Sequence, residues 1–234
     1  MTIVAGFSAA SGTEADDKNT ADAGHCAPGE TRIRYDNFDG RSGSIEVRDA
    51  NGMVLHARSI SAFVGAIPPL MPDARILTER GEVAAKDICA GDYVVTRENG
   101  LQPVRQVTGN SYDWRALGLN PLLRPVKVTA GALGDGLPTA DILLSPSQLL
   151  TVSLPGVAKA GEWLVRAIDL IGQEGVEQIT PSAINYLQLL FSERQYLMVD
   201  GFWNESLPQI RTDFFAFENS QPMPQDRLCQ PEQV

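Results

Sequence analysis

Turn-forming residue pairs divide the middle of this chain into many short apolar segments. Between residues 67 and 208, pairs such as Gly91-Asp92, Asn99-Gly100 and Pro155-Gly156 separate stretches rich in β-branched and aromatic residues. Glycine and asparagine tolerate positive φ and proline lacks an N–H, so such pairs end strands and form turns. Frequent turns between short apolar runs are typical of all-β folds. We expect strands at 75–78, 93–96, 104–107, 126–129, 141–144, 149–152, 163–166 and 196–199.

Three further segments are less regular. Residues 83–88 fit a short helical turn at best, and 163–171 is apolar enough to continue as a helix. Residues 182–191 fit either type of element by periodicity, but the aromatic and β-branched content of the segment favours a strand for its second half.

A β-hairpin is expected upstream of this region, around Asn51-Gly52. Apolar residues alternate on both sides of the pair: Ile45 and Val47 before it, and Met53, Leu55 and Ala57 after it. An Asn-Gly pair between alternating runs is a strong hairpin signal, because both residues tolerate the positive φ of a tight turn.

The composition changes along the chain and suggests four parts. Residues 1–32 are mostly small or polar and cannot bury enough apolar surface to offset their ordering entropy, so we expect a disordered tail. The hairpin extension spans 33–66 and the strand-rich domain spans 67–208. Residues 209–234, rich in proline, read as a C-terminal tail whose anchor is the apolar segment 213–217.

The charge and apolar pattern exclude several classes of partner. The net charge is −10, and Lys and Arg are scattered, which disfavours nucleic acids and anionic membranes. No apolar run approaches the roughly 20 residues that cross a bilayer. The first residues lack the basic region of a signal peptide, so a cytoplasmic location is the default. An acidic surface with aromatic spots suits another protein as partner, and the oligomeric state is left open.

No metal or cofactor site is expected. Cys26, Cys89 and Cys229 are too far apart for a metal-binding or disulfide pattern. Asp36 and Asp39 precede Gly40, but their spacing does not match a calcium-binding loop and favours a turn.

The segment from 69 to 107 fits a known motif frame. Pro72, Ile76, Thr78 and Gly81 match, without a gap, the pattern C-F-x-P-G-T-x-I-x-T-x-x-G. Ser145-Pro146 and Glu205-Ser206 continue the agreement downstream. The chain resembles the Hint (Hedgehog/intein) domain in its alphaproteobacterial form. The resemblance implies a pseudo-symmetric horseshoe of short antiparallel strands that cleaves itself, through attack of a cysteine thiol on the preceding peptide carbonyl.

The positions that carry this chemistry in the family hold other residues here. The nucleophile position is Pro69, and the histidine of the S-P-x-H stretch, which begins at Ser145, is replaced by Gln148. Two further histidine positions hold Gln188 and Gln195. Glutamine forms hydrogen bonds but exchanges no proton near neutral pH. The resemblance therefore implies a kept frame with vestigial site positions, and we expect a binding or structural module rather than an enzyme.

Two alternatives stay open at this stage. An active autoproteolytic Hint protein would need a non-standard nucleophile, and Cys26 beside His25, or Ser59 and Ser61, are the candidates. A second alternative is an unrelated all-β domain that shares short motifs. Trp114, Trp163 and Trp203 read as core or rim aromatics, with an exposed contact patch as the other interpretation.

Overall fold

The computed structural model describes residues 2–5, 30–36, 42–152, 163–206 and 220–222. Most of its elements are β-strands, and the pairings between named strands in these ranges are antiparallel. The mainly β, antiparallel fold class expected from the sequence is therefore confirmed. The chain divides into two compact units, Met1–Phe63 and Val64–Val234, and each is described by itself.

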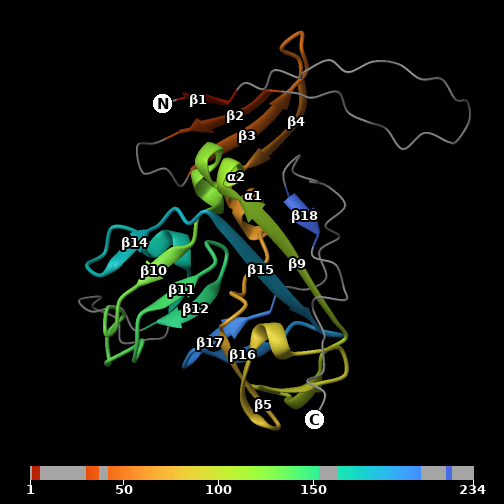
Figure 1. Ribbon diagram of the computed structural model, residues 1–234, viewed down its shortest axis with the longest axis vertical. Helices are drawn as coiled ribbons and strands as arrows, with labels where there is room; N and C mark the ends of the chain where they lie inside the picture. The colour runs from red at the N-terminus through yellow and green to blue at the C-terminus, as the bar shows by residue number, and fades with distance from the viewer. Residues whose placement is uncertain (1, 6–29, 37–41, 153–162, 207–219, 223–234) are drawn as a thin grey trace, which may run out of the picture. The chain divides into compact units, whose positions relative to one another are not determined.

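The first unit is a four-stranded sheet with the order β1-β2-β3-β4 (Figure 1). Its strands are β1 (Thr2–Ala5), β2 (Glu30–Tyr35), β3 (Gly43–Arg48) and β4 (Val54–Ser59), and helix α1 (Ile60–Gly65) follows. The Asp49 carboxylate accepts the backbone N–H groups of Asn51 and Met53 at 2.9 and 2.8 Å. These bonds close the turn between β3 and β4, so the hairpin expected at Asn51-Gly52 is confirmed.

Two strands of this sheet lie partly or wholly in the segment expected to be a disordered tail. Strand β1 lies within residues 1–32, and β2 begins at Glu30 rather than near residue 33. The register pairs Ile3 with Ile33, so a short β-branched segment gains a complete backbone partner at the sheet edge. This pairing could not be inferred from the composition of the tail, and residues 6–29 lie outside the described part of the chain.

The second unit is built on an eight-stranded sheet. Its main path is β13-β12-β17-β16-β5-β7-β8, and β6 pairs with β5. The strands are β5 (Arg75–Thr78), β6 (Gly81–Ala84), β7 (Tyr93–Thr96), β8 (Gly100–Pro103), β12 (Leu149–Val152), β13 (Trp163–Arg166), β16 (Tyr196–Val199) and β17 (Phe202–Glu205). Val199 of β16 pairs with Ile76 of β5, so strands from the two ends of this unit lie side by side.

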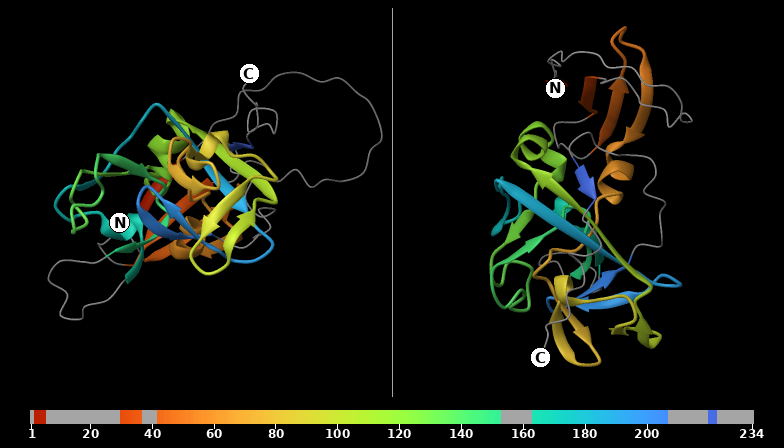
Figure 2. Two further views of the ribbon diagram at one scale, coloured as in Figure 1. Left: turned by 90° about the horizontal axis from the view of Figure 1, so that it is seen from below. Right: turned by 45° about the vertical axis from the view of Figure 1, so that its right-hand side comes forward.

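Two three-stranded sheets complete the second unit, with the orders β11-β10-β14 and β15-β9-β18. Their strands are β9 (Gln106–Asp113), β10 (Val126–Val128), β11 (Ile142–Leu144), β14 (Val176–Gln178), β15 (Ala183–Leu190) and β18 (Ser220–Pro222). Strands β9 and β15 pair along their whole length and run side by side in Figures 1 and 2.

Short helical segments and an apolar cluster connect these sheets. The helical segments are α2 (Trp114–Leu119), η1 (Ala85–Asp87), η2 (Pro121–Leu123) and η3 (Ala167–Leu170), of which the last three are 3-10 turns. Buried side chains from β10, β11, β12 and β17, among them Val126, Leu144, Leu150 and Phe202, form one core. Among the described residues, no helix has the length and apolar character needed to cross a membrane.

Five expected strands have the observed bounds: 75–78, 93–96, 149–152, 163–166 and 196–199. The strand expected at 104–107 is wrong in its first half, because β8 ends at Pro103 and β9 begins at Gln106, so that only residues 106–107 lie in a strand. Val104 instead exchanges backbone hydrogen bonds with the Gly91-Asp92 turn, both at 2.8 Å. Strands β10 and β11 are each one residue shorter than expected.

The ambiguous segments resolve in different ways. Residues 83–88 contain the single 3-10 turn η1, and 163–171 divides into β13 and the 3-10 turn η3. Residues 183–190 form a strand throughout, because β9 supplies a backbone partner for each of them. In the C-terminal segment, β18 pairs with β9, and residues 213–217 lie outside the described part.

We predict that Gly175→Ala destabilises the second unit through a steric clash. Gly175 has φ +78°, and an added Cβ would overlap Thr129 Oγ1 and lie 2.8 Å from the Ala132 Cβ. Overpacking of this kind costs about 1–3 kcal/mol beyond the strain of a positive φ. Gly172→Ala is the matched control, because Gly172 has φ +95° with no atom within 4 Å of the added Cβ. Equal losses in urea unfolding for the two variants would contradict the prediction.

Candidate functional site

The segment that enters β5 is buried and fixed to a distant strand. Residues 67–70 are all buried, and the Leu70 N–H donates to the Leu187 carbonyl at 2.9 Å. The Leu187 N–H donates back to the Leu70 carbonyl at 2.7 Å. This bridge holds the Pro68-Pro69 peptide beside β15, although the segment belongs to no named strand.

Two serine hydroxyls hold the carbonyl groups of the same segment. Ser145 Oγ donates to the Pro68 carbonyl oxygen at 2.8 Å, and Ser147 Oγ donates to the Ile67 carbonyl oxygen at 2.7 Å. Both serines are buried, with 0% and 2% of their surface exposed. The carbonyl that precedes Pro69 is therefore fixed by a side chain 77 positions away in the sequence.

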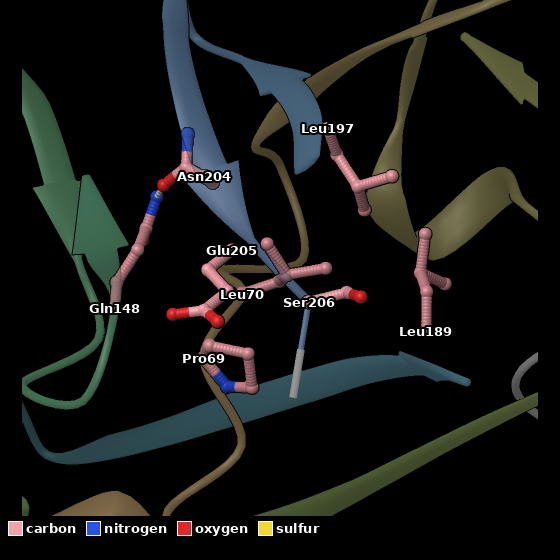
Figure 3. Close-up of a pocket in the computed structure, with 8 residues that line it drawn as sticks. All are labelled: Pro69, Leu70, Gln148, Leu189, Leu197, Asn204, Glu205 and Ser206. Carbon is pink, nitrogen blue, oxygen red and sulfur yellow. Dashed lines mark hydrogen bonds between the residues drawn. The ribbon is translucent and has the colours of Figure 1, made fainter. Parts of the chain in front are cut away.

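Gln148 lies one turn further along the chain and contacts β17. Its Nε2 donates to Asn204 Oδ1 at 2.9 Å, and Figure 3 shows the two amides pointing toward one another. The Asn204 amide nitrogen donates to the backbone carbonyls of Phe202 and Val199, at 2.8 and 3.3 Å. A buried amide pair thus connects the start of β12 to the β16–β17 hairpin.

Gln195 belongs to a second amide contact beside the same hairpin. Asn99 Nδ2 donates to Gln195 Oε1 at 2.9 Å, which fixes the β7–β8 turn to the start of β16. The Gln195 N–H donates to Ser206 Oγ at 2.8 Å, and the Ser206 N–H donates to the Gln195 carbonyl at 2.7 Å.

A small cavity lies where these segments meet, with a volume of about 10 Å³. It is lined by Pro69, Leu70, Gln148, Leu189, Leu197, Asn204, Glu205 and Ser206 (Figure 3). Glu205 contributes the charged group, and 9% of the Glu205 side chain is exposed. The Glu205 carboxylate pairs with Arg194 at 2.7 Å. A cavity of this size admits about one water molecule and no larger ligand.

Four of the five site positions named from the sequence come together here. Pro69 and Gln148 line the cavity, Ser145 holds the preceding carbonyl, and Gln195 contacts the lining residue Ser206. Gln188 does not line the cavity; it is buried in β15, opposite Thr108 of β9.

Sequence reasoning missed Asn204 and Ser147. Ser147 occupies a variable position of the S-P-x-H stretch, and Asn204 gave no signal because its partner Gln148 is 56 positions away. The neighbouring pair Glu205-Ser206 belonged to the motif frame and was a signal for this segment. The contact between Asn204 and Gln148 could not be derived from the sequence.

Other candidate groups do not form a reactive cluster in the described part of the chain. The structure shows there no group of three His, Cys, Asp or Glu side chains that could hold a metal ion. The backbone N–H of Cys89 donates to Asp92 Oδ2 at 2.8 Å, so Cys89 lies in a local turn. Cys26 and Asp39 lie outside the described residues.

The arrangement of residues 68–206 agrees with comparisons to known proteins. The family model for the Hint domain matches residues 68–211, which is more than half of the chain. The chain belongs to the Hint domain family. The comparison with curated protein sequences gives no match.

Solved inteins are similar to this Hint protein at low identity. The crystal structure of the gp41-1 intein is 14% identical, with a TM-score of 0.34, and covers 58% of this chain and 97% of its own. The crystal structure of the MchDnaB-1 intein is 14% identical, with a TM-score of 0.35, and covers 59% and 99%. The DnaX mini intein from Spirulina platensis is 13% identical, with a TM-score of 0.34, and covers 58% and 98%.

We predict that Ser145→Ala destabilises the protein by about 1–3 kcal/mol. The substitution leaves the buried Pro68 carbonyl without its donor at 2.8 Å, and an unsatisfied buried acceptor has a free-energy cost of this size. Ser192→Ala, at an exposed position, is the control and should change the free energy of unfolding by less than about 0.5 kcal/mol. Urea unfolding measures both, and a neutral Ser145→Ala would show that this bond does not hold the segment.

Asp200 is the titratable group that anchors the β16–β17 hairpin. It has φ +51°, and its Oδ1 accepts the Arg75 N–H at 2.8 Å. Burial raises the pKa of the Asp200 carboxyl, and the nearby Glu82 carboxylate raises this pKa further, against the opposing effect of the Arg75 N–H and charge. The folded state thus binds the proton more tightly than the unfolded state, so this group's contribution to stability falls as pH rises through the folded pKa.

We predict that Asp200→Asn raises the melting temperature at pH 7. Asparagine keeps an acceptor for the Arg75 N–H and tolerates positive φ, but it has no charge to desolvate. The gain should disappear below about pH 4, where the aspartate of the unfolded chain is also protonated. Asp135→Asn is the control, since Asp135 is exposed and has φ +52°. A gain that does not change between pH 7 and pH 3 would contradict the electrostatic cause.

Proposed function

We propose that this Hint protein has kept the frame of a self-processing site but does not cleave the Pro68-Pro69 peptide, and that it serves as a binding or structural module. The observation that carries the proposal is the contact of Ser145 Oγ with the Pro68 carbonyl, 2.8 Å long. The carbonyl that a self-processing domain would attack is held in place, while the next residue has no group that could attack it.

The chemistry of Pro69 supports inactivity at this peptide. An acyl shift needs a thiol or hydroxyl on the residue after the carbonyl, and the proline ring carries neither group. Its nitrogen also lacks a hydrogen. General acid–base catalysis needs a group that titrates near the working pH, and the Gln148 amide does not.

The alternative of a non-standard nucleophile gains no comparable support. Ser59 Oγ accepts the Ala62 N–H at 3.1 Å, which is the contact of a helix cap. Ser61 is exposed, and Cys26 lies outside the described residues. His25, the neighbour that could act as a base for Cys26, lies outside them as well.

Exposed aromatic side chains and the acidic charge support a protein partner. Trp114 is 63% exposed on α2, and Trp163 is 42% exposed on β13. Trp203 is half-buried, and the Arg97 guanidinium lies 5.7 Å from its ring centre. Exposed tryptophans are common at contact surfaces, because a large apolar ring contributes much of the binding energy there.

We predict a single full-length mass for the purified protein with a removable reporter ahead of Met1. Incubation at pH 7–9 should leave this mass unchanged, with or without dithiothreitol, which would intercept any thioester. A thiol-dependent break would overturn the proposal, and the fragment mass would locate the nucleophile.

We further predict that Pro69→Cys combined with Gln148→His restores a thiol-dependent break after residue 68. The cysteine supplies both a thiol and an amide N–H next to the carbonyl that Ser145 holds, and histidine supplies a group that titrates near neutral pH. Pro69→Ala with Gln148→His is the matched control and should stay intact. If Pro69→Cys with Gln148→His stays as intact in dithiothreitol as the control does, the frame no longer supports cleavage after residue 68.

A further inference from the structure

One buried atom at the cavity has no partner within the described residues. Gln148 is 2% exposed, and its Oε1 forms no hydrogen bond there. More than about 90% of buried polar groups in folded proteins have a partner, either protein or water. A buried carbonyl oxygen without a hydrogen bond raises the free energy of the folded state. A donor next to Gln148 Oε1 would remove this cost.

The contacts of Asn204 fix the orientation of the Gln148 amide. Both hydrogens of the Asn204 amide are used, by the Val199 and Phe202 carbonyls. Asn204 Oδ1 therefore faces Gln148 as an acceptor, and only Nε2 of Gln148 can satisfy it. Rotating the Gln148 amide by 180° would place two oxygens in contact, so Oε1 stays the unsatisfied atom.

The cavity limits what can donate to Gln148. Its volume of about 10 Å³ is close to the smallest space that holds one water molecule, and Gln148 is among its lining residues. Glu205 also lines it and provides a second acceptor. Arg194 pairs with Glu205 Oε1 at 2.7 Å, and 9% of the Glu205 side chain is exposed. Two acceptors next to a space of this size match the two hydrogens of one water.

We propose that the cavity binds one long-lived water molecule, which donates to Gln148 Oε1 and to the Glu205 carboxylate. The water connects the start of β12 to the end of β17, next to Pro69. This proposal rests on the proposed function, because it assigns a structural role to the site where the family's reaction would take place. The water would hold the two strands together through hydrogen bonds. The bound water has its hydrogens directed at two fixed acceptors, which restrains both strands.

A crystal structure of the full chain, at a resolution that reveals ordered water, tests this directly. We expect a peak about 2.8 Å from Gln148 Oε1, at hydrogen-bond distance, in crystals grown without ammonium salts. An empty cavity at that resolution, or a peak that appears only with ammonium present, would overturn the proposal. Because the crystal reports occupancy and intact mass reports cleavage, failure of the water site and failure of the proposed function are distinguishable.

Water magnetic relaxation dispersion provides a second test in solution. The wild-type protein should show one more long-lived water than Gln148→Met, which keeps the side-chain length without an acceptor. Gln173→Met, at an exposed position, is the control and should match the wild type. An unchanged count in a folded Gln148→Met protein would contradict the proposal. If that variant does not fold, the wild-type crystal decides the question alone.

Discussion

Two buried hydrogen bonds fix the path of the chain into the Hint domain. Ser145 and Ser147 donate to the carbonyls of Pro68 and Ile67, which lie 77 and 80 positions earlier. Hydroxyl and carbonyl groups removed from water must satisfy one another, so the segment has little freedom once the serines are buried. Strand β5 then begins at a defined place, where it can pair with β16 from the other end of the unit.

Uncharged amide side chains fix the geometry of the site around these bonds. Neutral amides form the contacts that hold these segments: Gln148 with Asn204, and Asn99 with Gln195. An amide can replace the hydrogen bonds of an imidazole but not its proton exchange near neutral pH. Under the proposed function, these contacts stabilise the Hint frame without self-processing chemistry at Pro69.

Local signals predicted a large part of the fold. The Asn51-Gly52 hairpin and five strands of the large sheet follow from turn residues and alternating apolar residues, because both depend on neighbours in the sequence. The prediction failed where a distant backbone intervened. Val104 pairs with the Gly91-Asp92 turn instead of extending a strand, and β15 is a strand throughout because β9 lies beside it.

The sequence by itself determined the β class and the family frame, since turn pairs and motif residues act over a few positions. It also identified Pro69 and Gln148 as residues that carry neither a thiol nor a group that titrates near neutral pH. Only the tertiary structure decided which positions meet: Ser145 at the Pro68 carbonyl, Gln148 at Asn204, and Gln188 away from the cavity in β15. These contacts join residues many positions apart, and their formation depends on sheet pairing and burial that no local pattern encodes.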